Sequence, residues 1–205
     1  MKKIITIQHT QSQHHINGMV GSQRDWPLTE LGLKQAKTIA ENIIKELEGM
    51  RIKLYASDQL RVSQGAKILA DLLKIKVHYD QRLREQHLGE AVGKSIEWLK
   101  SNILNQKVTA HAQIVKGAES LYDVWQRVQA FYDEMLTQKE DVIIVYSHGA
   151  LLSVFNLVHL KLSTESLNTS LIHGRSGSIS ILKILEDGRH SIERFNDMSY
   201  LKSSS

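Results

Sequence analysis

Hydrophobic and polar positions along this chain follow two periodicities in turn, one typical of strands and one of helices. Short runs rich in β-branched residues indicate buried strands. Between them, apolar residues recur three and four positions apart, which indicates helices with one buried face. The predicted strands cover 3–7, 52–56, 75–79, 142–146, 178–185 and 190–195. Four helices are predicted. The first runs from Thr29 to residue 47, the second includes 68–73, and the other two cover 120–136 and 150–160.

Strands that alternate with helices predict an α/β fold with a mostly parallel sheet and helices on both faces. The 205 residues fit one domain, 1–205, and we see no repeat or linker that would divide it. The stretch 94–116 matches neither periodicity well. We expect it to form helical and loop material, as a small cap over a site.

Composition narrows the protein class. There is no cysteine, which excludes disulfides and thiolate metal sites. The apolar run at the start of the chain ends at Ile7, too short for a signal peptide, and no later run could span a membrane. We therefore expect a cytoplasmic protein without a membrane partner. The formal net charge of +4 comes from scattered lysines and arginines, so we expect no nucleic-acid partner.

Reactive side chains follow four of the predicted strands, at the edge where open α/β sheets bind ligands. They are Gln8 and His9; Ser57, Asp58 and Arg61; Arg84, Glu85 and His87; and Ser147 and His148. Arginine grips phosphate oxygens with paired hydrogen bonds, and a neutral imidazole can attack phosphorus. A second histidine can donate to the equatorial oxygens, and a carboxylic acid can protonate the leaving oxygen. The set predicts phosphoryl transfer that needs no metal or organic cofactor.

The motifs around these residues resemble those of the histidine phosphatase superfamily, which includes the cofactor-dependent phosphoglycerate mutases. The resemblance spans almost the whole chain in the family's order. Its segments are Pro27-Leu28-Thr29-Glu30, Ser57-Asp58-Gln59-Leu60-Arg61, Leu83-Arg84-Glu85, Gly117-Ala118-Glu119-Ser120, Ser147-His148-Gly149 and Asn196-Asp197. It implies a three-layer α/β/α sandwich of the phosphoglycerate mutase type.

The resemblance also implies a role for each residue of the site. His9 is the implied nucleophile, Glu85 the proton donor, and Arg61 and His148 the phosphate clamp. The implied substrate-binding set is Gln8, His15, Gly21, Ser22 and Arg61. A metal site formed by His9, His14 and His15 is an alternative. Their spacing matches no common pattern of metal ligands, so we expect no metal site.

Three positions depart from the family pattern. Gln8 stands where the family has arginine, Thr10 where it has glycine, and His15 where it usually has asparagine. Losing one charged phosphate contact costs about 2–4 kcal/mol in a transition state, or roughly 10²–10³ in rate. A protonated His14 or His15, or Arg24 from the same loop, would restore positive charge.

Three functions are compatible with this pattern. The leading one is a phosphatase that hydrolyses a small phosphate monoester through phospho-His9. A phosphoglycerate mutase is the alternative among enzymes, but the segment after Glu85 follows the shorter phosphatase pattern. A phospholigand-binding module with weak or no activity is the third, motivated by Gln8. Specificity is expected in the loop 10–24 and in 94–116, and no motif indicates an oligomeric state.

Overall fold

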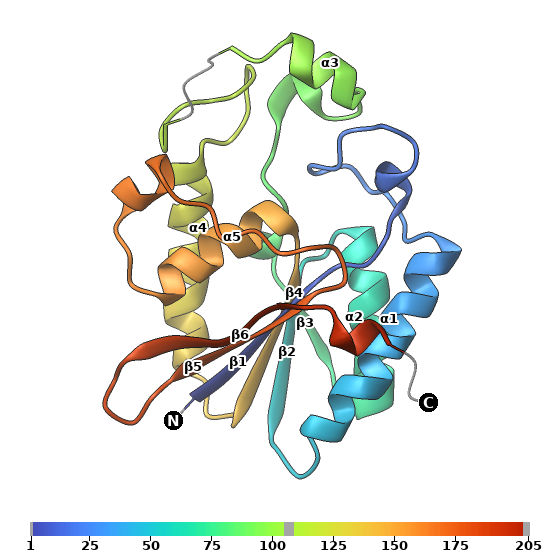
Figure 1. Cartoon of the computed structure of the whole chain (residues 1–205), viewed down its shortest axis with the longest axis vertical. Helices are drawn as coiled ribbons and strands as arrows, with labels where there is room; N and C mark the ends of the chain where they lie inside the picture. The colour runs from blue at the N-terminus through green and yellow to red at the C-terminus, as the bar shows by residue number, and fades with distance from the viewer. Residues whose placement is uncertain (1, 105–108, 203–205) are drawn as a thin grey trace.

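The fold is built on one six-stranded sheet. The computed structural model describes residues 2–104 and 109–202. The strand order is β3-β2-β4-β1-β5-β6 (Figure 1). The bounds are β1 Lys2–Gln8, β2 Ile52–Ala56, β3 Val77–Tyr79, β4 Val142–Ser147, β5 Ile179–Ile184 and β6 His190–Asp197. The first four strands in this order pair in parallel, whereas β5 and β6 pair antiparallel. The predicted α/β fold with a mostly parallel sheet is confirmed.

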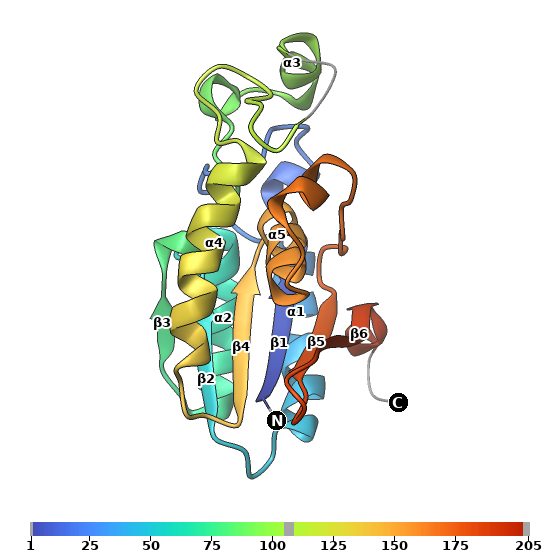
Figure 2. The same cartoon turned by 90° about the vertical axis from the view of Figure 1, so that its left-hand side faces the viewer.

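Helices cover both faces of the sheet. Figure 2 shows α4 and α5 in front of the strands and α1 and α2 behind them. The bounds are α1 Glu30–Ile43, α2 Leu60–Leu73, α3 Ile96–Ser101, α4 Leu121–Leu136 and α5 Gly149–His159. Neighbouring residues of β1 explain the layers: Ile4 packs in the core under α4 and α5, and Ile5 in the core under α1 and α2. Buried parallel strands read as continuous apolar runs because both faces are covered.

Local sequence signals fix where two of the helices begin. The Thr29 hydroxyl accepts a hydrogen bond from the Gly32 N–H, and Ser120 does the same for Asp123 at the start of α4. Such caps satisfy amide groups that the first helical turn leaves without partners. α1 ends earlier than the periodicity predicts, because its last turn, Ile44–Glu46, tightens into a 3₁₀ helix.

The carboxyl ends of the parallel strands meet below the loops in the upper half of Figure 1. In the pairing of β1 with β4, Gln8 lies opposite Ser147. His9 and His148 therefore leave the sheet side by side, and the His9 N–H donates to the Ser147 carbonyl at 3.0 Å. This is the edge of the sheet at which the sequence predicts a site.

The described parts of the predicted cap, 94–104 and 109–116, contain α3 and loops, at the top of Figure 1. A small separate core of Val20, Ala91, Val115 and Ala118 ties it to the loop after β1. Residues 105–108 of the predicted cap lie outside the described residues, and a capping role for the rest stays a prediction. Within 2–104 and 109–202, no helix has the length and apolar character needed to cross a bilayer.

Candidate active site

His9 is a buried neutral imidazole with a defined tautomer. It is 3% exposed, and its Nδ1 lies 2.8 Å from the Thr10 carbonyl oxygen. A carbonyl can only accept, so Nδ1 carries the hydrogen and Nε2 keeps its lone pair. Burial lowers the pKa of His9 well below 6.5, and the neighbouring Arg61 charge lowers it further. The ring is therefore neutral near pH 7, as a nucleophile at phosphorus must be.

Arg61 lies against this lone pair. Its Nε donates to His9 Nε2 at 3.2 Å, and its two terminal nitrogens donate to the carbonyls of Arg24 and Ser22 at 2.9 and 2.8 Å. The side chain is 1% exposed, and burial lowers its pKa to about 10. It thus stays charged at neutral pH. The structure places the predicted clamp residue in direct contact with the predicted nucleophile.

His148 lies on the other side of His9, with the two ring centroids 5.3 Å apart. Its Nε2 is 2.9 Å from the Ser57 hydroxyl, which itself accepts the Gln59 N–H. When the Ser57 hydroxyl donates its hydrogen to His148 Nε2, the imidazole hydrogen lies on Nδ1. That Nδ1 is buried and meets no acceptor among the described residues. It can donate to a bound oxyanion.

Glu85 is held by the first turn of α5. Its Oε1 accepts the N–H groups of Gln86 and Leu151 at 3.0 and 3.1 Å. Its Oε2 has one long contact, with the Ala150 N–H at 3.3 Å. Because Oε1 already accepts two hydrogen bonds, Oε2 is the oxygen free to carry and transfer a proton. The Glu85 carboxyl lies near enough to Arg61 to raise the pKa of that guanidinium, against the larger effect of burial.

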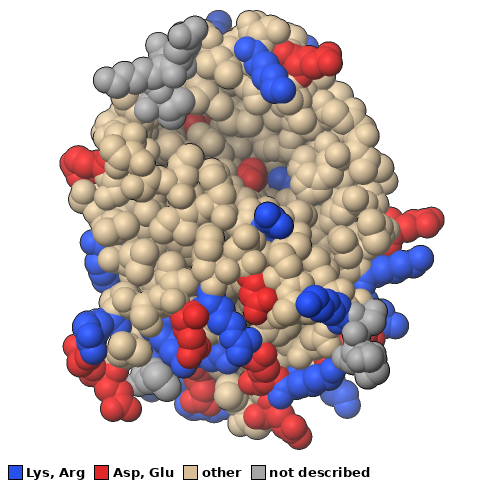
Figure 3. Space-filling view, in the orientation of Figure 1, with Lys and Arg blue, Asp and Glu red and all other residues tan. Residues whose placement is uncertain are grey.

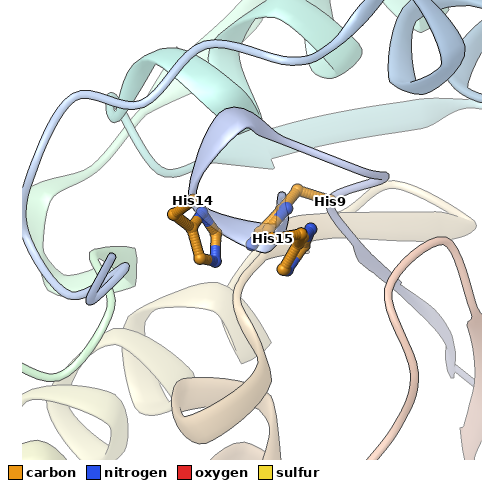
Figure 4. Close-up of side chains that lie close together, drawn as sticks. All are labelled: His9, His14 and His15. Carbon is orange, nitrogen blue, oxygen red and sulfur yellow. The ribbon is translucent and has the colours of Figure 1, made fainter. Parts of the chain in front are cut away.

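His14 and His15 bring two further imidazoles to His9, on the 3₁₀ helix Gln13–His15 (Figure 4). The His9 and His15 rings are stacked with centroids 5.5 Å apart, and the His14 ring lies 5.7 Å from His9. Burial, then His15, lowers the pKa of His14 to about 3. Burial and Arg61 also lower the pKa of His15. The expectation that one of them carries a positive charge is wrong for the free protein near neutral pH.

These three histidines could also offer nitrogens to a metal ion, since one from each lies within 4.8 Å of the others. Their hydrogen bonds favour an anion instead. The Ser12 N–H donates to His15 Nδ1 at 3.1 Å, so the free Nε2 of a neutral His15 carries a hydrogen. His9 Nε2 already accepts from the charged Arg61. A nearby guanidinium and an outward N–H suit a phosphate better than a cation.

Gln8 faces the start of α5 from the end of β1. Its Nε2 lies 3.1 Å from where a Cβ on Gly149 would stand, and its Oε1 lies 3.3 Å from the same point on Gly174. Glycines at both positions leave room for the carboxamide. Its amide group can thus reach the edge of the site beside His148, but it brings no charge. Its predicted contact with substrate stays a prediction.

Gly21 and Ser22 shape the site indirectly. A Cβ on Gly21 would stand 2.8 Å from His14 Nε2, so glycine is needed to admit that ring. The Ser22 hydroxyl donates to the Gln86 carbonyl and accepts the Leu88 N–H, both at 2.9 Å. Its hydroxyl is therefore committed within the protein. Ser22 contributes to the site through its carbonyl, which holds Arg61.

Three residues support the site in roles that the sequence analysis did not assign to them. Ser12 orients His15, and Ser57 orients His148. Arg127 donates to the carbonyls of Arg84 and Glu85 at 2.7 and 3.2 Å and so fixes the backbone that carries the acid. Ser57 lies inside a family-like motif, which was a usable signal. Ser12 and Arg127 act through contacts that only the folded chain reveals.

Figure 3 shows a hollow in the molecular surface, with an acidic and a basic group at its floor and a further basic group just below it. Arg84 and Arg127 are paired with Asp58 and Glu119, so their charges are largely compensated. Arg61 is thus the charged donor in contact with the nucleophile. The site suits a small anionic group bound by one arginine and several neutral N–H donors.

Comparison with known proteins supports this picture. Residues 4–198 match the profile of the histidine phosphatase superfamily (branch 1). The putative phosphoserine phosphatase 2 of Hydrogenobacter thermophilus is 26% identical over 82% of this chain and 83% of its own. The probable phosphoglycerate mutase GpmB of Yersinia enterocolitica is 30% identical over 66% of this chain and 64% of its own.

Solved structures agree on the fold. A mycobacterial glucosyl-3-phosphoglycerate phosphatase complexed with VO3 has a TM-score of 0.82 at 22% identity, covering 96% of this chain and 99% of its own. The α-ribazole phosphatase of Shigella flexneri has a TM-score of 0.79 at 19% identity, covering 96% of both chains. With a family match that runs from β1 past the end of β6, and a His9–Arg61–His148 cluster at the sheet edge, this chain belongs to the histidine phosphatase superfamily.

Proposed function

We propose that this protein is a phosphatase that hydrolyses a small phosphate monoester through a phosphohistidine on His9. The observation that carries the proposal is the state of the His9 ring. Its Nδ1–H is used by the Thr10 carbonyl, burial keeps the ring neutral, and its Nε2 lone pair faces the charged Arg61. A nucleophile that lies against a phosphate-binding guanidinium suits phosphoryl transfer.

The proposed cycle has two displacements. In the first, His9 Nε2 attacks phosphorus, the ester P–O bond breaks, and Glu85 Oε2 gives its proton to the leaving oxygen. In the second, the Glu85 carboxylate takes a proton from water as that water attacks phosphorus, and the P–N bond breaks. Arg61, His148 Nδ1–H, His15 Nε2–H and the Gln8 amide donate to the three equatorial oxygens. No step uses a metal or an organic cofactor.

The family relatives support a phosphatase more than a mutase. The relative from Hydrogenobacter thermophilus, named a phosphoserine phosphatase, aligns over 83% of its length, whereas the named mutase aligns over 64%. Phosphoserine is a small monoester, and we propose a substrate of that class for this chain. We also propose that it acts in the cytoplasm.

A binding module with little turnover is the second candidate. Gln8 favours it, because a neutral amide stabilises transition-state charge less than arginine does. The presence of Glu85 as a proton donor argues against a binding module. Glu85 is held by three backbone N–H groups and by the network through Arg127, an arrangement that phosphate binding alone does not require.

The decisive experiment is metal-free hydrolysis of p-nitrophenyl phosphate by wild type and by His9→Ala. Rapid quench with ³²P-labelled ester should trap an acid-labile phosphoprotein in wild type only. His78→Ala, which changes a histidine on β3 away from the site, is the control and should behave as wild type. Turnover that survives His9→Ala would overturn the nucleophile, and phosphate binding without turnover would favour the binding module.

The role of Glu85 has its own signature. Glu85→Gln keeps the shape but cannot transfer a proton. The comparison uses kcat/KM, which reports the first displacement and not the later hydrolysis of phospho-His9. A leaving group of low basicity needs little protonation, so kcat/KM for p-nitrophenyl phosphate should fall only modestly. An alkyl phosphate needs the proton, and its kcat/KM should fall about 10²-fold or more. Equal losses for both esters would contradict a proton-donor role.

A further inference from the structure

Two buried carboxamide oxygens behind the site have no hydrogen-bond donor among the described residues. They are Gln8 Oε1 on β1 and Asn156 Oδ1 on α5. Asn156 is 3% exposed, and its amide nitrogen is 3.4 Å from the Ile172 carbonyl. Buried polar atoms without partners are uncommon in folded proteins, and each calls for an explanation.

The two residues that carry these oxygens, Gln8 and Asn156, line the same small cavity between β1, α5 and β5. Its volume is about 10 Å³, which is room for one water molecule. The hydroxyl-bearing residues Thr6, Ser178 and Ser180 also line it. One water could therefore donate to the two carboxamide oxygens and accept from a hydroxyl, which meets its requirement for two to four polar partners.

We propose that one buried water occupies this cavity and, together with Asn156, fixes the orientation of the Gln8 carboxamide. Because the water donates to Gln8 Oε1, the amide nitrogen Nε2 must face Gly149 and the phosphate site. Rotated by half a turn, the carboxamide would present an oxygen to an anionic substrate and repel it. Asn156 is thus a positioning residue that acts through Gln8, and this inference rests on the phosphate site of the proposed function.

An arginine at position 8 would not need such a device, because every polar atom of a guanidinium is a donor. A glutamine offers a donor and an acceptor of similar shape, so its two orientations must be distinguished by its surroundings. Neither Gly149 nor Gly174 has a side chain to do so. The water in the cavity favours one of the two orientations, because it donates a hydrogen bond to the carboxamide oxygen.

The test is a double-mutant cycle on affinity for inorganic phosphate, measured by calorimetry. Asn156→Leu removes the oxygen and fills the cavity, and should weaken phosphate binding about 5-fold, the value of one neutral hydrogen bond. In a Gln8→Leu background there is no amide to orient, so the same substitution should change affinity by less than about 2-fold. Asn156→Ala in both backgrounds gives the same comparison if the leucine variant fails to fold.

Ser153→Ala is the matched control. Ser153 is also a buried polar residue of α5, and its hydroxyl accepts the Ile172 N–H at 3.1 Å. It therefore shares the anchoring of Ile172 with Asn156 but does not line the cavity. Its effect on phosphate affinity should be the same in the Gln8 and Gln8→Leu backgrounds. If Ser153 coupled to Gln8 as strongly as Asn156 does, the effect on phosphate affinity would come from the anchoring of Ile172 and not from the cavity.

The outcomes separate this inference from the proposed function. If p-nitrophenyl phosphate is not turned over but the phosphate affinities show the expected coupling, the positioning role stands and the phosphatase proposal fails. Equal losses in both backgrounds, or no loss from Asn156→Leu, would overturn the inference. A crystal structure at about 1.5 Å with no density in the cavity would overturn it independently.

Discussion

The Nε of Arg61 donates a hydrogen bond to Nε2 of His9 at 3.2 Å, with both side chains almost fully buried. The permanent charge of Arg61 opposes a second charge on His9, and burial opposes it more strongly. The contact thus keeps the nucleophile neutral while holding a phosphate-binding group beside it. When a phosphate oxygen binds, Arg61 can donate its hydrogen bond to that oxygen, which frees the lone pair on His9 Nε2 to attack phosphorus.

The first prediction concerns the acid side of the pH–rate profile. An ordinary histidine is about nine-tenths protonated one unit below a pKa of 6.5. From pH 6.5 to 5.5 the neutral fraction of such a histidine falls about 5-fold. The pKa of His9 lies well below 6.5, so its ring stays neutral, and kcat/KM should change by less than about 2-fold over the same range. Steady-state kinetics on p-nitrophenyl phosphate from pH 4.5 to 8 checks this. An acid limb with its midpoint near 6.5 would contradict the neutral buried nucleophile.

The second prediction concerns the missing charge at position 8. Gln8→Arg should raise kcat/KM for p-nitrophenyl phosphate by about 10- to 10³-fold, because it adds a charged donor to the equatorial oxygens. Gln8→Leu, similar in size but without a donor, should lower it. The measurement is kcat/KM beside thermal unfolding, which checks that the longer side chain fits between Gly149 and Gly174. Identical rates for all three proteins would show that residue 8 does not touch the phosphate.

The third prediction concerns His15. We expect it to act as a neutral Nε2–H donor, so His15→Asn, which keeps an amide donor, should retain most activity. His15→Phe keeps a ring beside His9 but removes the donor, and should lower kcat/KM about 5- to 10-fold. The ratio to wild type should be constant from pH 5.5 to 8. A loss confined to the acidic end would instead indicate a protonated His15.

The fourth prediction concerns Gly32. A Cβ at this position would stand 1.9 Å from the Gln11 carbonyl oxygen, which belongs to the loop that follows His9. Gly32→Ala should therefore displace that loop, with a loss of about 2–4 kcal/mol in unfolding free energy and a loss of activity. Thr38→Ala, at a partly exposed position of the same helix, should change both the unfolding free energy and the activity by little. Chemical denaturation of the two variants provides the comparison.

The fifth prediction concerns stability at low pH. His159 is buried, with Tyr132 Oη 2.9 Å from Nδ1 and the Ser191 carbonyl 3.1 Å from Nε2. Burial lowers its pKa to about 4, whereas it titrates near 6.5 in the unfolded chain. Between these values the unfolded state binds more protons, so stability should fall as pH falls from 6.5 to 4.

Calorimetric melting at pH 8, 6 and 5 measures this effect. His159→Gln should lower Tm at pH 8, because the hydrogen bonds are made less well. It should also reduce the fall in Tm between pH 6 and 5, because one titrating group is gone. Burial also lowers the pKa values of His9, His14 and His148, and these groups remain in the variant. The variant should therefore keep part of the fall in Tm with falling pH. An unchanged fall in Tm would show that His159 does not contribute and would assign the effect to the other histidines.

The helices and strands, and the α/β class to which they belong, could be predicted from the amino-acid sequence alone. Strand 52–56 is predicted and observed with the same bounds, and Thr29 caps α1 as its residue type predicts. These features are local: a buried parallel strand needs a run of apolar residues, and a cap needs a hydroxyl at one position. The order of reactive residues after the strands was equally readable, because side chains at carboxyl ends share one edge of the sheet.

The protonation states and tautomers of the site depend on contacts that form only in the folded chain. Nothing in the spacing of His9, His14 and His15 indicates that burial and Arg61 keep them neutral, because desolvation depends on what packs around each ring. The sequence likewise could not show that Ser12 orients His15 or that Asn156 shares a cavity with Gln8. Charge, tautomer and orientation arise from neighbours that are distant along the chain, and only folding brings those neighbours together.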